Sequence, residues 1–228
     1  MIIVIGGIKG GAGKTTIATN LTVIYALQGL RVLLVDADEQ RSSSDWAEHR
    51  ESLGITTPWT TIQLLGAGVR AQILKMSKDY DVIIVDTGGR DTTSQRSALT
   101  VADIFLAPFQ PRSLDVWTAG KVVDLVNEIK AVNPKLSAYA IINRADPKGM
   151  DNQDTAEILQ EYDEINYIPT SIGQRKAFAN AASEGLGVIE LKTPDTKASL
   201  EINLLSNALI LTKMVSQKGH NNTTETPQ

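Results

Sequence analysis

Eight residues at positions 9 to 16 carry the clearest chemical signal in this chain, and they follow shortly after an apolar run at residues 2–5. Because glycine lacks a Cβ, the backbone here can approach a ligand closely and point successive N–H groups into an anion site. Lys14 is expected to bind the β and γ phosphates of a nucleotide, and the Thr15 hydroxyl is expected to bind Mg²⁺. The residues predicted to bind the nucleotide are Gly10, Gly11, Ala12, Gly13, Lys14, Thr15 and Thr16.

Two aspartates end apolar runs further along the chain. Asp36 follows the run at 32–35, and Asp86 follows the run at 82–85. An aspartate at the end of a buried strand can reach Mg²⁺ directly or through water, and phosphoryl transfer needs a metal that spreads charge. Thr15, Asp36 and Asp86 are therefore the predicted metal ligands. For either aspartate taken alone, the alternative is a helix cap or a turn residue.

Five short apolar runs are predicted strands, at residues 2–5, 32–35, 82–85, 104–107 and 138–142. They are continuous rather than alternating, which predicts a mostly parallel sheet buried on both faces. Helical patterns lie at residues 15–27, 43–52, 67–78 and 114–131, and a final helix is expected at 198–216. Strands that alternate with helices predict a doubly wound α/β fold, in which ligands bind beyond the carboxyl ends of the strands.

Length and composition limit the class of protein. The 228 residues, of which 42% are hydrophobic, suit one domain over residues 1–216, and the polar stretch 217–228 is expected to be a disordered tail. The chain has no cysteine, which excludes disulfides and cysteine-ligated clusters and fits a cytoplasmic location. Two histidines are too few for a histidine-based metal centre.

Charge and hydropathy indicate which binding partners can be expected. The net charge of −4 argues against a globally basic nucleic-acid-binding protein, so any DNA contact is expected from a local patch. No apolar run reaches the roughly 18 residues of a membrane-spanning helix. The final helix also lacks a face rich in Lys and Arg, so a membrane partner is not expected.

The loop departs from the strict phosphate-loop pattern, because Ile8 stands where that pattern has glycine. With Lys9 four residues before Gly13, the loop resembles the deviant Walker A loop of the ParA/MinD superfamily of P-loop ATPases. The resemblance implies that Lys9 reaches across an interface to the partner's phosphates, so that a homodimer forms on ATP binding. The alternative is that Lys9 contacts only its own nucleotide or solvent.

Two further segments carry the same resemblance. Residues 36–38 resemble switch I of ParA-type ATPases, which implies that Asp36 helps to hold the metal and that Asp38 orients the attacking water; Glu39 stands where the family has proline. Residues 86–89 resemble switch II. The resemblance thus implies three catalytic residues, Lys9, Lys14 and Asp38. Asn143 matches a position that contacts the adenine base in the family, and a turn asparagine is the alternative.

The resemblance spans roughly residues 1–190. Residues 108–115 resemble the segment after the fifth strand in small plasmid-type ParA proteins, and residues 171–188 resemble their late helix and following strand. Since the phosphate loop starts at once, the expected type is the short ParF-like one without its own operator-binding module. The missing cysteines exclude relatives that hold an iron–sulfur cluster, such as nitrogenase iron protein.

The function that this resemblance implies is a partition or positioning ATPase. Such a protein binds ATP and Mg²⁺, dimerises, holds nonspecific DNA such as the nucleoid, and hydrolyses ATP when a ParB-like cargo adaptor stimulates it. Candidate DNA contacts are Arg175, Lys176, Lys192, Lys197 and Lys213, with solvated surface charge as the alternative. Three other hypotheses remain open: a MinD-like membrane-associated ATPase, a dethiobiotin-synthetase-like ligase, and a DNA-transfer accessory ATPase, for which residues 38–40 and Trp46 are suggestive.

Overall fold

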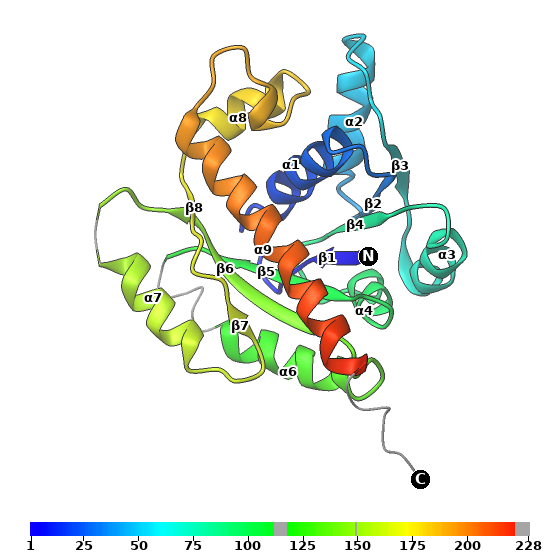
Figure 1. Cartoon of the computed structure of the whole chain (residues 1–228), viewed down its shortest axis with the longest axis vertical. Coiled ribbons are helices and arrows are strands. Elements are labelled where there is room, and N and C mark those ends of the chain that lie inside the picture. The colour runs from blue at the N-terminus through cyan, green and yellow to red at the C-terminus, as the bar shows by residue number, and fades with distance from the viewer. Residues whose placement is uncertain (112–117, 149, 222–228) are drawn as a thin grey trace.

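A parallel sheet with helices on both faces forms the centre of the molecule (Figure 1). The computed structural model describes residues 1–111, 118–148 and 150–221, with side chains as far as residue 211. The strand order is β3-β2-β4-β1-β5-β6-β7, and β8 pairs with β6. The strands are β1 (Ile2–Ile5), β2 (Val32–Ala37), β3 (Thr60–Gln63), β4 (Val82–Thr87), β5 (Ile104–Phe109), β6 (Ser137–Ala145), β7 (Asn166–Tyr167) and β8 (Ile172–Gly173). The predicted doubly wound α/β fold is confirmed.

Two apolar cores lie on opposite faces of this sheet. The helices on the first face are α1 (Lys14–Leu27), α2 (Ser42–Ser52), α8 (Lys176–Ser183) and α9 (Thr196–Asn221). Those on the second face are α3 (Val69–Met76), α4 (Thr93–Leu99), α6 (Ala119–Lys130) and α7 (Asp151–Gln160). Strands β1, β2, β4 and β5 are buried along their whole length, as their continuous apolar runs require.

Several observed helices are longer or shorter than predicted. The helix expected at 67–78 is a 3₁₀ turn, η1 (Gly66–Gly68), followed by α3. For the helix expected at 114–131, the described part is α6, and residues 114–117 lie outside the described residues. The final helix runs from Thr196 to Asn221, so it includes five residues of the expected polar tail. The rest of that tail, 222–228, lies outside the described residues, as do 112–115 of the segment after β5.

One prediction about the C-terminal half is wrong. A strand was expected after the late helix, but among residues 184–221 the structure has only η2 (Val188–Glu190), a 3₁₀ turn, and α9. Gly185 has a φ of +67°, which turns the chain sharply after α8. A Cβ on Gly187 would lie 3.0 Å from Val23 of α1, so this segment packs under α1 instead of joining the sheet.

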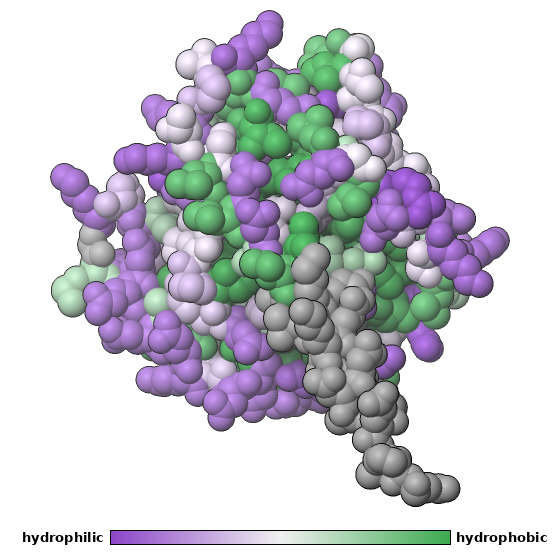
Figure 2. Space-filling view, in the orientation of Figure 1, coloured by the Kyte–Doolittle hydropathy of each residue, from purple (hydrophilic) through white to green (hydrophobic). Residues whose placement is uncertain are grey.

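Helix α9 lies across the first face of the sheet, and Figure 2 looks onto this side of the molecule. Ile202, Leu205 and Leu209 are fully buried, which confirms that the helix docks on the core. Leu200 and Leu204 are 58% and 46% exposed, so a second apolar stripe faces outward. Among the described residues, no helix is long and apolar enough to cross a bilayer.

Candidate nucleotide-binding site

The loop between β1 and α1 has the conformation that a phosphate site needs. Gly11 and Gly13 have φ values of +80° and +83°, in the left-handed region that favours glycine. Gly13 directly precedes α1, and its carbonyl accepts the first helical hydrogen bond, from the Ile17 N–H at 3.1 Å. The N-terminus of α1 therefore opens into the loop and presents its unpaired N–H groups and partial positive charge there.

Two side-chain amides from neighbouring strand ends hold the loop. Gln110, just after β5, donates from Nε2 to the Gly11 carbonyl at 2.9 Å. Asn143, on β6, donates from Nδ2 to the Ala12 carbonyl at 2.6 Å and is buried. These two hydrogen bonds tie the loop to the ends of β5 and β6 and restrain its conformation.

Lys14 lies inside this loop. Its side chain is 6% exposed, and its Nζ donates to the carbonyl of Lys9 at 3.1 Å. Burial lowers the pKa of Lys14, and the carboxylates of Asp86 and Asp38 oppose that shift. The ammonium is thus held in the curve of the loop, beside the two acids.

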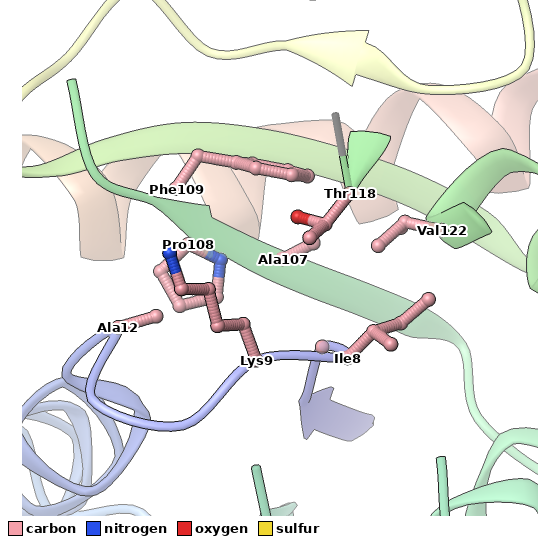
Figure 3. Close-up of a pocket in the computed structure, with 9 residues that line it drawn as sticks. Ile8, Lys9, Ala12, Ala107, Pro108, Phe109, Thr118 and Val122 are labelled. Carbon is pink, nitrogen blue, oxygen red and sulfur yellow. The ribbon is translucent and has the colours of Figure 1, made fainter. Parts of the chain in front are cut away.

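Lys9, near the start of the loop, is exposed. Figure 3 shows its side chain extending from the loop toward Pro108. The pocket drawn there is lined by the loop, the end of β5 and the start of α6, with Ile8, Phe109 and Val122 among its residues. Lys9 is therefore the exposed lysine of the loop and Lys14 the buried one.

The two predicted metal-binding aspartates are direct neighbours, because their strands pair. Asp36 of β2 and Asp86 of β4 are opposite each other in the parallel register. Asp36 is fully buried; its Oδ2 accepts from the Ser44 N–H at 2.8 Å and its Oδ1 from the Asp38 N–H at 3.1 Å. Asp36 therefore also fixes the start of α2 and the turn that carries Asp38.

Asp86 is nearly fully buried, and its Oδ1 has no hydrogen-bond partner among the described residues. Burial raises the pKa of Asp86 to about 7; the Thr15 hydroxyl opposes this shift, and the nearby Asp36 carboxylate adds to it. A buried carboxylate oxygen without a donor suits a bound cation, since a cation supplies the missing charge.

The donor set around Asp86 fits Mg²⁺. No group of three or more His, Cys, Asp or Glu side chains in the described ranges is arranged to hold a metal. Mg²⁺ in nucleotide sites is held by one or two carboxylates together with phosphates and water, so it does not require such a group. Asp36, Asp86 and the Thr15 hydroxyl provide that type of site.

The segments that resemble switch I and switch II meet the loop closely. Asp38 is half-buried, and a Cβ on Gly88 would lie 3.1 Å from its Oδ1. A Cβ on Gly89 would lie 2.5 Å from the Cα of Gly10, so only glycine permits this backbone contact. Residues 88–89 therefore pack directly against the phosphate loop.

A cleft of about 240 Å³ opens on the other side of the loop. Its lining includes Gly13, Thr16, Asn143, Arg144 and Phe178. Arg144 has a φ of +56° at an irregularity in the pairing of β6 with β8, which turns the chain beside the cleft. The cleft adjoins the phosphate loop, where a nucleoside attached to the phosphates would lie.

The structure brings the predicted site residues together and also adds some that the sequence did not indicate. Gln110 and Gln95 both hydrogen-bond the loop region, although neither was predicted to have a role. Gln110 could have been found from its place three residues after the predicted strand at 104–107, at the end of that strand where ligands bind. The suggestive Trp46 is 7% exposed and stacks on Trp59, with centroids 5.6 Å apart, so it belongs to the core.

The candidate DNA-binding cations differ in how exposed their side chains are. Arg175 is ion-paired with Glu201, which leaves its side chain 26% exposed. Lys176, Lys192 and Lys197 are exposed and come from α8, the loop after η2 and the start of α9. The side chain of Lys213 lies outside the described residues.

Comparisons with known proteins agree with this geometry. The family model of the CobQ/CobB/MinD/ParA nucleotide-binding domain matches residues 3–188. Maintenance of carboxysome distribution protein A from Halothiobacillus neapolitanus is 28% identical over 90% of this chain and 94% of its own length. The protein of the same name from Gloeobacter kilaueensis is 31% identical over 80% of this chain and 81% of its own. The structure of apo McdA from Cyanothece superposes with a TM-score of 0.76 at 19% identity, covering 91% of this chain and 98% of that one.

Proposed function

Because the chain belongs to the CobQ/CobB/MinD/ParA nucleotide-binding family of ATPases, we propose that it is a positioning or partition ATPase that dimerises on ATP and Mg²⁺. In this proposal it binds nonspecific DNA and is stimulated by a ParB-like or other cargo adaptor. The observation that carries the proposal is the buried Asp86 oxygen, which has no hydrogen-bond partner among the described residues, near the Lys14 ammonium that the loop holds. A positive charge and a cation site side by side suit a nucleoside triphosphate.

The loop binds the phosphates. The backbone N–H groups of residues 10–16 and the N-terminus of α1 provide fixed donors, and Lys14 provides a full charge. Lys14 is already desolvated, so it gives up little further hydration when phosphate oxygens replace the Lys9 carbonyl as its partner. Asn143 keeps the loop in place and borders the cleft that receives the adenine base.

Thr15, Asp36 and Asp86 would hold Mg²⁺, and the bound cation would supply positive charge beside the phosphates. Asp36 is oriented by two backbone N–H groups, whereas Asp86 keeps one oxygen open. Asp38 lies on the turn that Asp36 fixes and faces Gly88. It accepts a hydrogen bond from the attacking water and so orients that water toward the γ phosphate.

Lys9 joins two copies of the chain. It is exposed, and its side chain extends from the loop toward Pro108 (Figure 3). A lysine there can reach the phosphates of a second copy that faces the loop, which makes dimerisation depend on ATP. The dimer then presents two copies of any cationic surface to DNA, so that the phosphate contacts of both copies contribute to the affinity for DNA.

The DNA contact is assigned to the exposed cations near the start of α9, namely Lys176, Lys192 and Lys197. The overall charge of −4 requires such a local surface. The adaptor and its cargo are other molecules, and the two carboxysome-distribution relatives are named for one such cargo. The place of action in this proposal is the cytoplasm, on the nucleoid.

One observation favours a second candidate, a MinD-like ATPase that binds membrane surfaces. Leu200, Leu204 and Leu211 of α9 are exposed, at 58%, 46% and 60%. These residues lie four and seven positions apart along one helix and form an apolar stripe, as in helices that lie in a membrane interface. Such helices also carry cations beside the apolar stripe. The sequence of the final helix has no face rich in Lys and Arg, and this favours the DNA-binding candidate over the membrane-binding one.

Binding to random-sequence duplex DNA tests the proposal, measured with ATP, with ADP and without nucleotide across a salt series. The expected result is binding with ATP only, which falls steeply as salt rises and is lost in Lys9→Ala. Lys75→Ala, which removes an exposed lysine on α3, is the matched control and should bind normally. Binding to anionic liposomes with none to DNA would contradict the proposal and support the second candidate.

A further inference from the structure

Gln95 on α4 is fully buried and lies between the start of the phosphate loop and the end of β4. Its Oε1 accepts a hydrogen bond from the N–H of Gly7 at 3.0 Å. The same oxygen lies 2.8 Å from the hydroxyl oxygen of Thr87. One carbonyl group therefore contacts the start of the phosphate loop and the end of β4 at once.

Both partners of Gln95 are adjacent to residues of the nucleotide site. Gly7 is where β1 leads into the loop, and Thr87 directly follows Asp86. The Thr87 hydroxyl also lies 3.0 Å from the carbonyl of Ile5, so it links β4 to β1 at this level. A Cβ on Gly6 would lie 2.6 Å from Gln95 Oε1, which shows how tightly the amide fits against the loop's first residues.

An apolar side chain would fill this position at a lower desolvation cost. The Nε2 of Gln95 is buried and has no partner among the described residues, and such an unpaired donor destabilises the folded state. The glutamine is therefore not optimal for stability alone. What it supplies is its carbonyl oxygen, which joins Gly7 and Thr87.

We propose that Gln95 is a positioning residue for ATP hydrolysis: its carbonyl fixes the phosphate loop relative to Asp86 and the glycines that follow it. It touches neither nucleotide nor metal and acts through Gly7 and Thr87. This inference rests on the ATPase site proposed above. Binding of ADP depends mainly on the loop and Lys14, whereas hydrolysis also requires the loop and residues 86–89 to be aligned.

Steady-state kinetics of Gln95→Met test this role, because methionine has a similar volume and lacks the acceptor. We expect kcat to fall about tenfold, while KM for ATP and the Kd for ADP each stay within about threefold. Gln95→Glu keeps an acceptor oxygen at the same place and should lose clearly less activity than the methionine variant. Ser94→Ala removes another buried hydrogen bond of α4, to the Gly66 N–H, and is the control that should keep wild-type kcat.

Thr87→Val provides a second test that leaves Gln95 in place. We expect the same selective loss of kcat, and a loss in the double variant that is clearly smaller than the sum of the two single losses, because both changes break the contact between Gln95 and Thr87, although Thr87→Val also removes the contact with the Ile5 carbonyl. Additive losses, or an unchanged kcat in a folded Gln95→Met protein that still binds ADP, would overturn the positioning role. If the methionine variant fails to fold, the kcat of Thr87→Val compared with that of Ser94→Ala tests the positioning role instead. An unaltered protein without any ATP hydrolysis would instead contradict the proposed function.

Discussion

The side-chain amide of Asn143 donates to the carbonyl of Ala12 over 2.6 Å and so ties β6 to the middle of the phosphate loop. A Cβ on Gly13 would lie 2.1 Å from the same nitrogen, so the amide and the loop fit each other closely. The residue predicted to contact the adenine base thus also holds the loop that binds the phosphates. The two roles are separable by experiment.

Replacing Asn143 with Ala should weaken binding of both ATP and GTP about tenfold. The change leaves the buried Ala12 carbonyl without its donor, which costs roughly 1–3 kcal/mol. An additional loss of preference for ATP over GTP is the expected sign of a base contact. Isothermal titration with both nucleotides measures the two effects. Asn166→Ala, which removes a long amide–carbonyl contact on β7, is the control, and equal affinities in the two variants would contradict the loop-holding role.

Replacing Gly89 with Ala should disturb the contact between residues 88–89 and the loop. The new methyl group would lie 2.5 Å from the Cα of Gly10, so one backbone must move. We expect ATP turnover to fall at least tenfold. Gly68→Ala is the matched control, because a Cβ there meets nothing within 4 Å. Normal turnover in the Gly89 variant would show that this contact is not needed for hydrolysis.

Asp86 gives the protein without Mg²⁺ and nucleotide a characteristic pH dependence. Burial raises the pKa of Asp86 to about 7, above the ordinary aspartate value of 3.8. The folded state therefore holds this proton more tightly than the unfolded chain does. The resulting stability is fully present below about pH 4 and is lost as the pH rises through about 7.

Chemical denaturation of the wild type and of Asp86→Asn at several pH values measures this effect. The asparagine variant does not titrate at this position, so the wild type should lose stability relative to it by up to roughly 4 kcal/mol between about pH 4 and pH 8. Addition of Mg²⁺ and nucleotide should remove most of the difference at high pH, because the cation neutralises the carboxylate. Parallel pH profiles would contradict a buried, uncompensated Asp86.

Replacing Asp38 with Ala should separate binding from hydrolysis. Asp38 faces Gly88 and lies near Lys14, but the loop is held by other residues. We expect ATP affinity within about threefold of the wild type and turnover slower by about a hundredfold, within the usual contribution of a general base. Asp79→Ala, which removes an exposed carboxylate in the turn before β4, is the control. Unchanged turnover in the Asp38 variant would remove it from the water-orienting role.

The sequence alone predicted the centre of the sheet and the main residues of the site, for a physical reason. Continuous apolar runs mark strands buried on both faces, and parallel strands end at one edge, so the loop, Asp36 and Asp86 had to meet. Strand β3 was missed because three of its four residues, Thr60–Gln63, are polar and the strand lies at an exposed edge. Helix α4 was missed because it has only seven residues.

Gln95 could not have been predicted at all. Its role depends on a contact with Gly7, which is 88 residues away in the sequence, and no local pattern specifies that contact. The expected strand near residue 188 failed because Gly185 and Gly187 place that segment under α1. The contact of Gln95 is a tertiary one, which hydrophobic periodicity does not encode. The strand near residue 188 was expected from the family resemblance, which did not account for the packing of this segment on α1.

The molar mass in solution tests the central claim most directly, measured by light scattering with ATP and Mg²⁺ and with ADP and Mg²⁺. We expect a dimer with ATP and a monomer with ADP for the Asp38→Ala variant, which keeps its ATP. Adding Lys9→Ala or Lys14→Ala to that variant should leave a monomer in both states, because the first removes the contact across the interface and the second removes nucleotide binding. A mass that is the same with ATP and ADP, or a dimer that persists without Lys9, would contradict an ATP-driven switch between one copy and two.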